Sequence, residues 1–382
     1  MLRARPFILL FLFLFMTPVL AGDPYPPQMS VSFLAEPAPI VQDGSTRLVY
    51  EMAVSNYAKS RYVLETVEAR AGGTRASFSG PTLTSMIVRF GSDGKPDMAK
   101  GGAIEGGGGA IIFLMLDLGK DQAPGAIEHS LHVRDEQGGA HDVMLASLPV
   151  SSERPIVVAP PLKGEWIAGD AVNNLPDAAH RRAVLIDGGR AWVAQRYAID
   201  WLQTQIVNGA RSTWRGPEDK NESYFCYDKP IYSVAAGRVV RMADGAPENV
   251  PHSGKYAIAI DFNNAAGNHV VVEIAPDRYV LYAHMRPGTV TVKPGDQVRV
   301  GEILGHVGNT GSSTEPHLHM HIDDHPSFLA GNGVPYEFTE GEASGPVQAD
   351  VSSPGAISFG PIGRLEPFRN DYPASNALVT FR

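Results

Sequence analysis

Three histidines alternate with other residues in the stretch STEPHLHMHI, at His317, His319 and His321. Strict alternation predicts a β-strand, because side chains two positions apart on a strand point to the same face. The three imidazoles would then share one face of a sheet. Such a face can hold a metal ion and do chemistry, or it can be a polar, solvated side of the sheet. The alternation alone does not decide between these interpretations.

The motifs around these histidines are more specific. From Tyr279 to Ile322 the chain reads YVLYAHMRPGTVTVKPGDQVRVGEILGHVGNTGSSTEPHLHMHI. This segment resembles the lysostaphin/LytM-type zinc metallopeptidases, which have a YAH strand, a glycine-rich hairpin series and a PHLH terminus. Upstream, IYSVAAGRVVRMADG at 231–245 resembles a strand-turn-strand unit of the same family. The ordered conjunction of these motifs, over roughly residues 196–323, is specific, whereas H-x-H alone is weak.

The resemblance implies a role for each polar residue of the motifs. His319 and Asp200 would be zinc ligands, and His284 and His317 would be a catalytic pair that does not touch the metal. Zinc accepts histidine nitrogen and carboxylate oxygen, and a catalytic site keeps one position for a water that ionises near neutral pH. The extra histidines would stabilise the oxyanion or move protons. The family has no ligand at the place of His321, so we expect a rim or supporting role there.

The chain departs from the family at the first ligand. The family motif H-x-x-x-D supplies two ligands from one segment, but the residue four positions before Asp200 is Arg196. An arginine side chain stays protonated and has no lone pair for a metal. Either the site is degenerate, or a residue elsewhere supplies the third ligand.

His180 is the candidate for that third ligand. The pattern of segment 180–200 predicts a β-hairpin that turns at Asp-Gly-Gly, residues 187–189. A three-residue loop there places His180 directly opposite Arg196, on the face that Asp200 shares. A two-residue loop instead places His180 on the wrong face. The zinc site of His180, Asp200 and His319 therefore depends on register, and a solvated hairpin histidine or a degenerate site stay open.

The composition predicts the elements that must position these residues. Gly 40, Pro 30 and only 19% charged residues favour many short strands joined by turns. We predict a mainly β protein, with an N-terminal immunoglobulin-like β-sandwich and an antiparallel β-sheet metallopeptidase domain that is, by the resemblance, of the duplicated-hybrid-motif type. The predicted segments are a signal peptide at 1–21, the sandwich at 29–155, a linker at 156–165, the metallopeptidase domain at 166–338 and a C-terminal tail at 339–382.

The N-terminal sequence predicts export. MLRARPFILLFLFLFMTPVLAG has a basic start, a short apolar core and a small-residue cleavage site, which together are typical of a secretory signal peptide. No cysteine lies near that cleavage site, so we expect a mature chain without a membrane anchor, in the periplasm or outside the cell. Cys226 is the only cysteine, so no internal disulfide forms. A formal net charge of -9 argues against nucleic acid as a partner.

Together these features predict an exported zinc metalloendopeptidase that hydrolyses the peptides of bacterial peptidoglycan. The substrate comes from the resemblance and from the export signal. The alternative is a catalytically degenerate domain of the same type that regulates or activates other cell-wall hydrolases, which the replacement at Arg196 keeps open. A carrier domain related to biotinyl domains is a third interpretation, but no Met-Lys turn is present. The sandwich is expected to be a binding or spacer domain, and the sequence does not indicate a protein partner for it.

Overall fold

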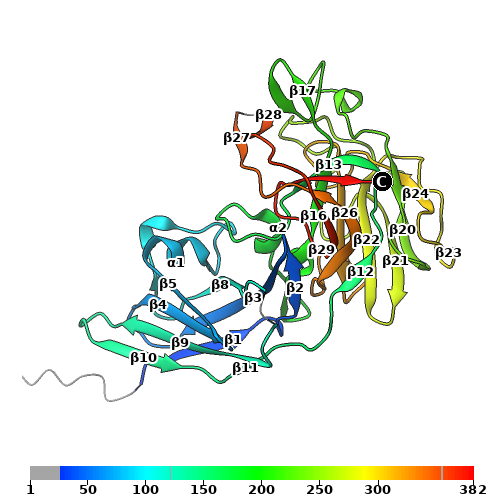
Figure 1. The fold of residues 1–382 in the computed structure, drawn as a ribbon. Helices are drawn as coiled ribbons and strands as arrows, with labels where there is room; N and C mark the ends of the chain where they lie inside the picture. The colour runs from blue at the N-terminus through cyan, green and yellow to red at the C-terminus, as the bar shows by residue number, and fades with distance from the viewer. Residues whose placement is uncertain (1–25, 121, 354–355) are drawn as a thin grey trace, which may run out of the picture.

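The structure is a computed structural model that describes residues 26–120, 122–353 and 356–382 (Figure 1). The signal peptide predicted at 1–21 lies outside these residues. Within them the chain is mainly β, as the composition predicted, and the strand pairing is predominantly antiparallel. No helix among the described residues is long and apolar enough to span a bilayer.

The N-terminal half consists of two antiparallel sheets packed on one another (Figure 1). One sheet comprises β1 (Met29–Phe33), β2 (Pro39–Gln42), β3 (Ser45–Asn56), β6 (Ile87–Arg89) and β8 (Gly109–Asp117). The other comprises β4 (Tyr62–Ala71), β5 (Thr74–Ser79), β7 (Ala103–Ile104), β9 (Ala126–Arg134), β10 (Ala140–Met144) and β11 (Leu148–Pro149). Helix α1 (Gly80–Met86) follows β5, and the 3-10 turn η1 (Met98–Lys100) precedes β7. A sandwich is present, and its immunoglobulin-like connectivity stays a prediction.

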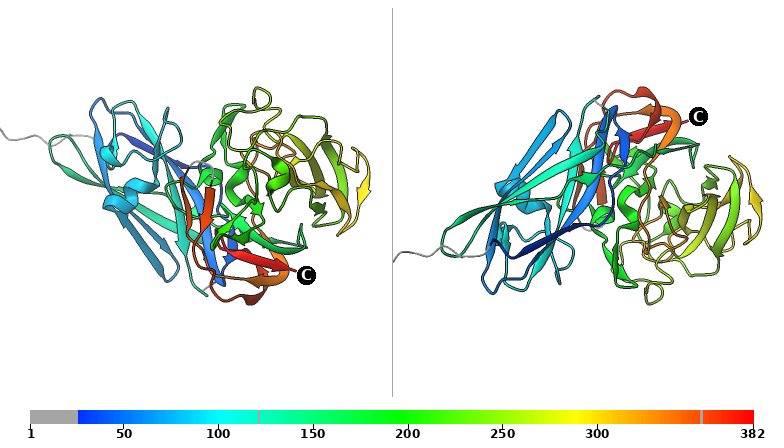
Figure 2. Two further views of the ribbon diagram at one scale, coloured as in Figure 1. Left: turned by 90° about the horizontal axis from the view of Figure 1, so that it is seen from above. Right: turned by 90° about the horizontal axis from the view of Figure 1, so that it is seen from below.

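Strand β3 is buried on both faces. Tyr50 and Met52 are in the core between the two sheets of the sandwich. Val49, on the opposite face, belongs to the core of the C-terminal half. Glu51 points the same way as Val49 and has 0% exposure. The C-terminal half therefore packs directly on the outer face of this strand (Figure 2).

An eleven-stranded sheet organises the C-terminal half, in the order β12-β26-β30-β13-β16-β25-β22-β21-β20-β23 with β29 paired to β26. All of its pairs are antiparallel except β12 with β26. The strands are β12 (Ile156–Val158), β13 (Gly164–Gly169), β16 (Ile199–Leu202), β20 (Gly237–Ala243), β21 (Asn268–Ala275), β22 (Arg278–Met285), β23 (Gln297–Val298), β25 (Leu318–Asp323), β26 (Tyr336–Ala343), β29 (Glu366–Asp371) and β30 (Leu378–Phe381).

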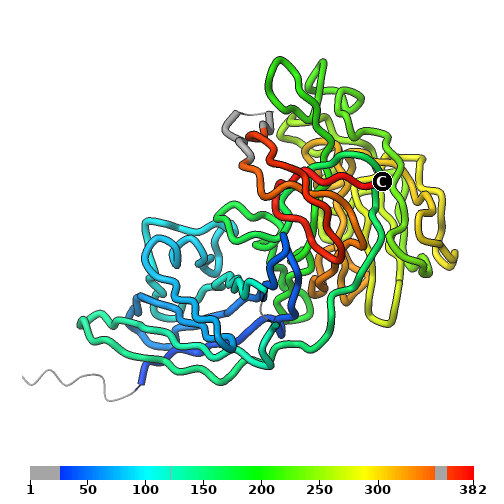
Figure 3. The backbone as a smooth tube through the Cα atoms, in the orientation of Figure 1, coloured from blue at the N-terminus to red at the C-terminus, as the bar shows by residue number. Residues whose placement is uncertain are grey.

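Strands β26, β29 and β30 bring much of the C-terminal segment 339–382 into this sheet, so the segment is not a separate tail. Strand β30 pairs with β13, and the red C-terminal segment runs beside the green strand in Figure 3. Phe381 packs its ring 5.4 Å from Trp201 and 5.3 Å from Phe338. Strand β12 lies within the predicted linker and also joins the sheet. We propose that the second domain extends from 156 to 382.

Smaller elements surround the sheet. Two hairpins are β14 (Leu185–Asp187) with β15 (Arg190–Trp192), and β17 (Gln205–Val207) with β18 (Ala210–Ser212), the latter extended by β28 (Ala356–Phe359) and β27 (Ala349–Ser353). Strand β19 (Pro230–Tyr232) pairs with β24 (Ile303–His306). The helical pieces are α2 (Ala179–Arg182), η2 (Ala194–Tyr197) and η3 (Asn221–Ser223).

Candidate metal centre

The sheet register brings Asp200 and His319 together. These two residues are direct partners on the antiparallel strands β16 and β25. Directly opposed side chains share a face, and Nδ1 of His319 lies 2.9 Å from Oδ1 of Asp200. Two residues 119 positions apart in the chain thus form one half of a candidate site.

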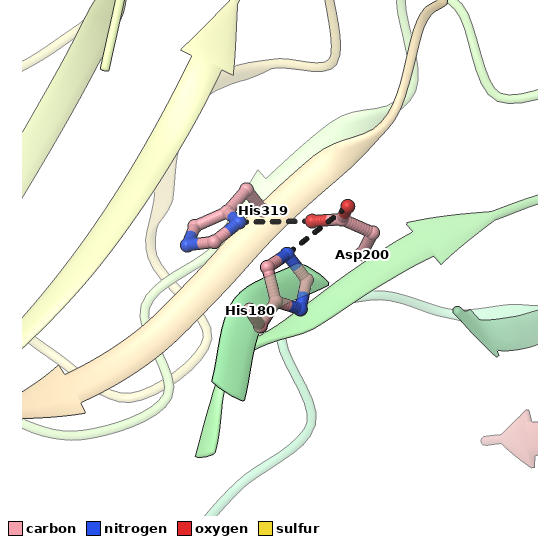
Figure 4. A group of neighbouring side chains, drawn as sticks. All are labelled: His180, Asp200 and His319. Carbon is pink, nitrogen blue, oxygen red and sulfur yellow. Dashed lines mark hydrogen bonds and ion pairs between the residues drawn. The ribbon is translucent and has the colours of Figure 1, made fainter. Parts of the chain in front are cut away.

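His180 completes the cluster from helix α2 (Figure 4). Its Nε2 lies 3.2 Å from Oδ2 of Asp200. Its Nδ1 donates to the carbonyl oxygen of Asp170 at 3.0 Å, and its backbone N–H donates to the Asp170 carboxylate at 2.9 Å. A hydrogen bond from the second ring nitrogen fixes the orientation of a ligating histidine. Asp170 therefore holds Nε2 of His180 toward the cluster, a role that no sequence motif indicated.

The three donors fit a zinc ion. One ligand atom each from His180, Asp200 and His319 lies within 4.8 Å of the other two. Zinc with bonds of about 2.0–2.2 Å in tetrahedral geometry holds neighbouring ligand atoms about 3.3 Å apart. The separations at the Asp200 carboxylate are near that value, 2.9 Å from Oδ1 to Nδ1 of His319 and 3.2 Å from Oδ2 to Nε2 of His180. Two imidazoles and one carboxylate are also a donor set typical of catalytic zinc.

The path by which His180 reaches this place differs from the predicted hairpin. The hairpin pairs Asp187 with Arg190 and has a two-residue turn at Gly188 and Gly189, which have φ values of 57° and 75°. Two consecutive glycines adopt this left-handed turn at no steric cost. The pairing ends at Leu185, and His180 lies beyond it on a helix. The predicted register and the predicted strand for His180 are both wrong.

Arg196 lies away from the donors. It is part of the turn η2 and not of strand β16, so the predicted shared face with Asp200 is wrong. Its guanidinium forms a bidentate ion pair with Glu51 of the sandwich, with Nε 3.0 Å and Nη2 2.7 Å from Oε2. Arg196 also donates to the carbonyl oxygen of Gly333 at 3.3 Å. Arg196, at the position of the family's first ligand, therefore bonds Glu51 and Gly333 and not the donor cluster.

The predicted catalytic pair lies next to the donors. The rings of His284 and His317 are 4.8 Å apart, and Nε2 of His317 is 3.4 Å from Oδ1 of Asp200. Each Nδ1 is within hydrogen-bond distance of a carbonyl oxygen, that of Thr310 for His284 and that of Glu315 for His317. His284 also has a φ of 60°, a backbone conformation that is uncommon for non-glycine residues.

His321 is buried in the cluster and not at its rim. It has 0% exposure, and its Nδ1 lies 2.9 Å from Nε2 of His319. When Nδ1 of His319 faces the metal, its Nε2–H can donate to His321 and so fix the ring. Phe328 packs its ring against His319 at 5.0 Å and contacts His284 and His321 as well. Phe328 was not predicted from the sequence, because its loop carries no motif.

The pKa values in the cluster differ widely. Burial lowers the pKa of His180, but Asp200 and Asp170 outweigh it and raise the value to about 10. Burial lowers the pKa of His319 to about 4 and holds that of His284 well below its usual range. The pKa of Asp200 is well below its ordinary value, because its histidine neighbours outweigh its burial. At neutral pH, Asp200 and His319 are thus already in their ligating forms.

A cleft between the two halves opens onto the cluster. It has a volume of about 1040 Å³. Its walls come from the sandwich, from the segment around α2 and from the C-terminal strands. Residues that line it include Phe78, Met86, His180, Asp200, Val347 and Phe359. The Asp200 side chain keeps 27% exposure, so this cleft connects solvent with Asp200 and His180.

Comparisons with known proteins place the C-terminal motifs in a family. Residues 224–332 match the model of Peptidase family M23, a range that includes His284, His317 and His319. Lysostaphin of Staphylococcus simulans is 39% identical over 76 residues, which are 20% of this chain and 15% of lysostaphin. Glycyl-glycine endopeptidase ALE-1 of Staphylococcus capitis is 38% identical over 77 residues, 20% of this chain and 21% of that protein.

The matched segments are short relative to whole proteins. The chain spans about a fifth or less of the length of these two curated relatives. The crystal structure of a mutant catalytic domain of the prophage-encoded M23 protein EnpA from Enterococcus faecalis aligns with 20% identity and a TM-score of 0.27, over 46% of this chain and 93% of that chain. The family match begins at 224, after the segment that holds His180, Arg196 and Asp200. The resemblance predicted from the motifs is confirmed: residues 224–332 are similar to peptidase family M23, and the matched segment is similar to lysostaphin.

Proposed function

We propose that this protein is an exported zinc metalloendopeptidase that hydrolyses peptide bonds of bacterial peptidoglycan. The observation that carries the proposal is the convergence of His180, Asp200 and His319 within 4.8 Å of one another. The histidine pair His284 and His317 lies directly beside them. Three donors with an adjacent acid–base pair are the components that metal-assisted hydrolysis requires.

The metal and the neighbouring side chains would have different roles in hydrolysis. Bound zinc would supply a water of lowered pKa and polarise the scissile carbonyl. Because Nδ1 of His317 and Nδ1 of His284 donate to backbone carbonyls, the Nε2 atoms are the ones that can bond the substrate oxygen or move a proton. Phe328 covers one side of His319 and excludes water there.

Peptidoglycan is the substrate that fits the family and the predicted export best. Glycyl-glycine endopeptidase ALE-1 cleaves, by its name, a peptide bond between glycines, and the matched family range includes the proposed catalytic histidines. The cleft of about 1040 Å³ reaches His180 and Asp200 from the interface of the two halves. An extended peptide placed there would present its backbone to the donors.

A regulator with a degenerate site is the second candidate, and Arg196 is its only specific support. The ion pair with Glu51 removes Arg196 from the donors, and His180 lies in contact with Asp200. A site that had lost its function would have no need for a substitute donor. These contacts favour the peptidase over the regulator.

Digestion of purified peptidoglycan tests the proposal. We expect the mature protein to release soluble peptides, detected by mass spectrometry. A zinc chelator should stop the release, and added zinc should restore it. The variant His319→Ala is the matched inactive control. A wild-type protein that purifies without zinc, takes none up and releases no peptides would instead support the regulator.

A further inference from the structure

Glu51 is a buried carboxylate of the sandwich that contacts both segments around the candidate metal centre. It is on β3, has 0% exposure and faces the C-terminal half. Its partners are Arg196 of η2 and Arg181 of α2. Arg181 directly follows His180 in the chain.

Glu51 forms a close ion pair with Arg196 and a longer one with Arg181. Arg196 pairs bidentately, with three N–O distances of 3.2, 3.0 and 2.7 Å. Nε of Arg181 lies 3.6 Å from Oε1 of the same carboxylate. The guanidinium of Arg181 also donates to the carbonyl oxygens of Tyr50 and Leu114, on the strands β3 and β8. Its Nη1 donates to Oδ1 of Asn174 at 2.6 Å, so Arg181 bonds the sandwich with Nη2 and its own half of the chain with Nη1.

Helix α2 depends on these contacts for its position. It has four residues, and a single turn is not stable on its own in water. Arg182 adds a hydrogen bond to the carbonyl oxygen of Ser85 and stacks over Phe113 with a distance of 4.9 Å, again on the sandwich. The place of His180 therefore depends both on Asp170 and on the sandwich, a domain that contributes no donor itself.

We propose that Glu51 is a positioning residue for the metal centre. Its carboxylate holds Arg181, and through the helix it aligns Nε2 of His180 with Asp200. The same carboxylate binds Arg196 and keeps that cation away from the donors. The sandwich is then a structural part of the metal site rather than a spacer. This inference rests on the proposed zinc site.

A second ion pair between the halves provides a matched control. Glu153 lies 2.6 Å from Arg278, which begins strand β22. This pair also links the segment after the sandwich to the C-terminal sheet, but Glu153 is 68% exposed, and among the described residues no hydrogen bond or ion pair joins its side chain to α2. Glu51→Gln and Glu153→Gln therefore make the same chemical change in two ion pairs between the halves. Only the pair of Glu51 involves helix α2.

The test is the zinc affinity of full-length variants, measured by competition with a chromophoric chelator. We expect Glu51→Gln and Arg181→Met to bind zinc about 10- to 100-fold more weakly than wild type, the range found for residues that orient metal ligands. Glu153→Gln should bind like wild type. The visible spectrum of bound cobalt(II) should change in the first two variants and stay unchanged in the third.

Arg181→Met is decisive if Glu51→Gln fails to fold, because it leaves the Glu51–Arg196 pair intact. In the His180→Ala background, Arg181→Met should cost little further affinity, since its effect passes through His180. Zinc binding by folded Arg181→Met within about threefold of wild type would overturn the inference while leaving the zinc site standing. A wild-type protein that binds no zinc would remove the proposed function as well.

Discussion

Zinc affinity should depend steeply on pH because of one residue. In the metal-free protein, His180 lies between the carboxylates of Asp200 and Asp170. They overcome the effect of burial and raise its pKa to about 10. A metal binds only the neutral imidazole, so binding must expel the proton. His319, with a pKa of about 4, has no proton to release at neutral pH.

The size of the effect follows from the pKa. As long as the pH is below the pKa of His180, each pH unit strengthens binding about tenfold, so affinity rises about 100-fold between pH 6 and pH 8. A histidine with an unperturbed pKa of about 6.5 would give only about a fourfold rise over the same interval. Each zinc bound at pH 7 should release about one proton.

Two measurements check this expectation. Chelator competition at pH 6, 7 and 8 gives the slope, and calorimetry in buffers of different ionisation enthalpy gives the number of protons released. The variant His180→Gln should bind more weakly and lose the proton release. The reasoning would be refuted if the zinc affinity of the wild type rose about fourfold or less from pH 6 to pH 8, or if the heat of binding did not depend on the buffer. Either result would mean that His180 is not protonated in the metal-free protein.

Three further results are expected. His317→Ala should retain one zinc per chain and lose about 10²- to 10⁴-fold in peptide release, because it removes an acid–base group and no donor; loss of the metal would contradict this. Phe381→Ala should lower the free energy of unfolding by about 3–5 kcal/mol in urea titrations, since the ring packs in the core. A change below about 1 kcal/mol would indicate that the C-terminal segment is a separate tail. The metal-free protein should lose stability as the pH rises from about 6.5, the ordinary pKa of histidine, toward the pKa of about 10 for folded His180. That pH dependence should be absent from His180→Gln in the same titrations.

Much of the sheet geometry was predictable from the sequence. The alternation of His317, His319 and His321 identified a strand, and β25 carries the last two. The period of two fixes which side chains share a face, and this is local information. The pairing of His319 with Asp200 required the family resemblance, because register between strands 119 residues apart has no local signal.

The conformation of the segment around His180 could be predicted only in part from its own sequence. The Asp-Gly-Gly turn was recognised, but both glycines adopt left-handed conformations, and the loop is shorter by one residue than predicted. The single turn α2 was missed, because its place depends on contacts with the sandwich. The structure does bring His180 to Asp200, and its role as a ligand stays a prediction.

The strands of the C-terminal segment were hidden for a similar reason. Residues 339–353 are rich in acidic and small residues, a composition typical of a surface tail. Strand β30 pairs with β13, which precedes it by more than 200 residues, and the start of β26 pairs with β12, about 180 residues earlier, so no local pattern predicts either pairing. Only Phe381 and its neighbours on β30 had a recognisable strand pattern.

The arginine at position 196 is explained by its contact with the N-terminal half of the chain. By the resemblance, the family has a metal-binding histidine at that position, whereas the arginine of this chain binds Glu51 across the interface of the halves. The donor set is then completed by His180, on a helix held by that same carboxylate through Arg181. If the docking of the halves positions a ligand, thermodynamic reciprocity requires that the bound metal also strengthens the docking. On this proposal the substitution has turned a metal site confined to one domain into one that links two, so metal binding and domain association must change together.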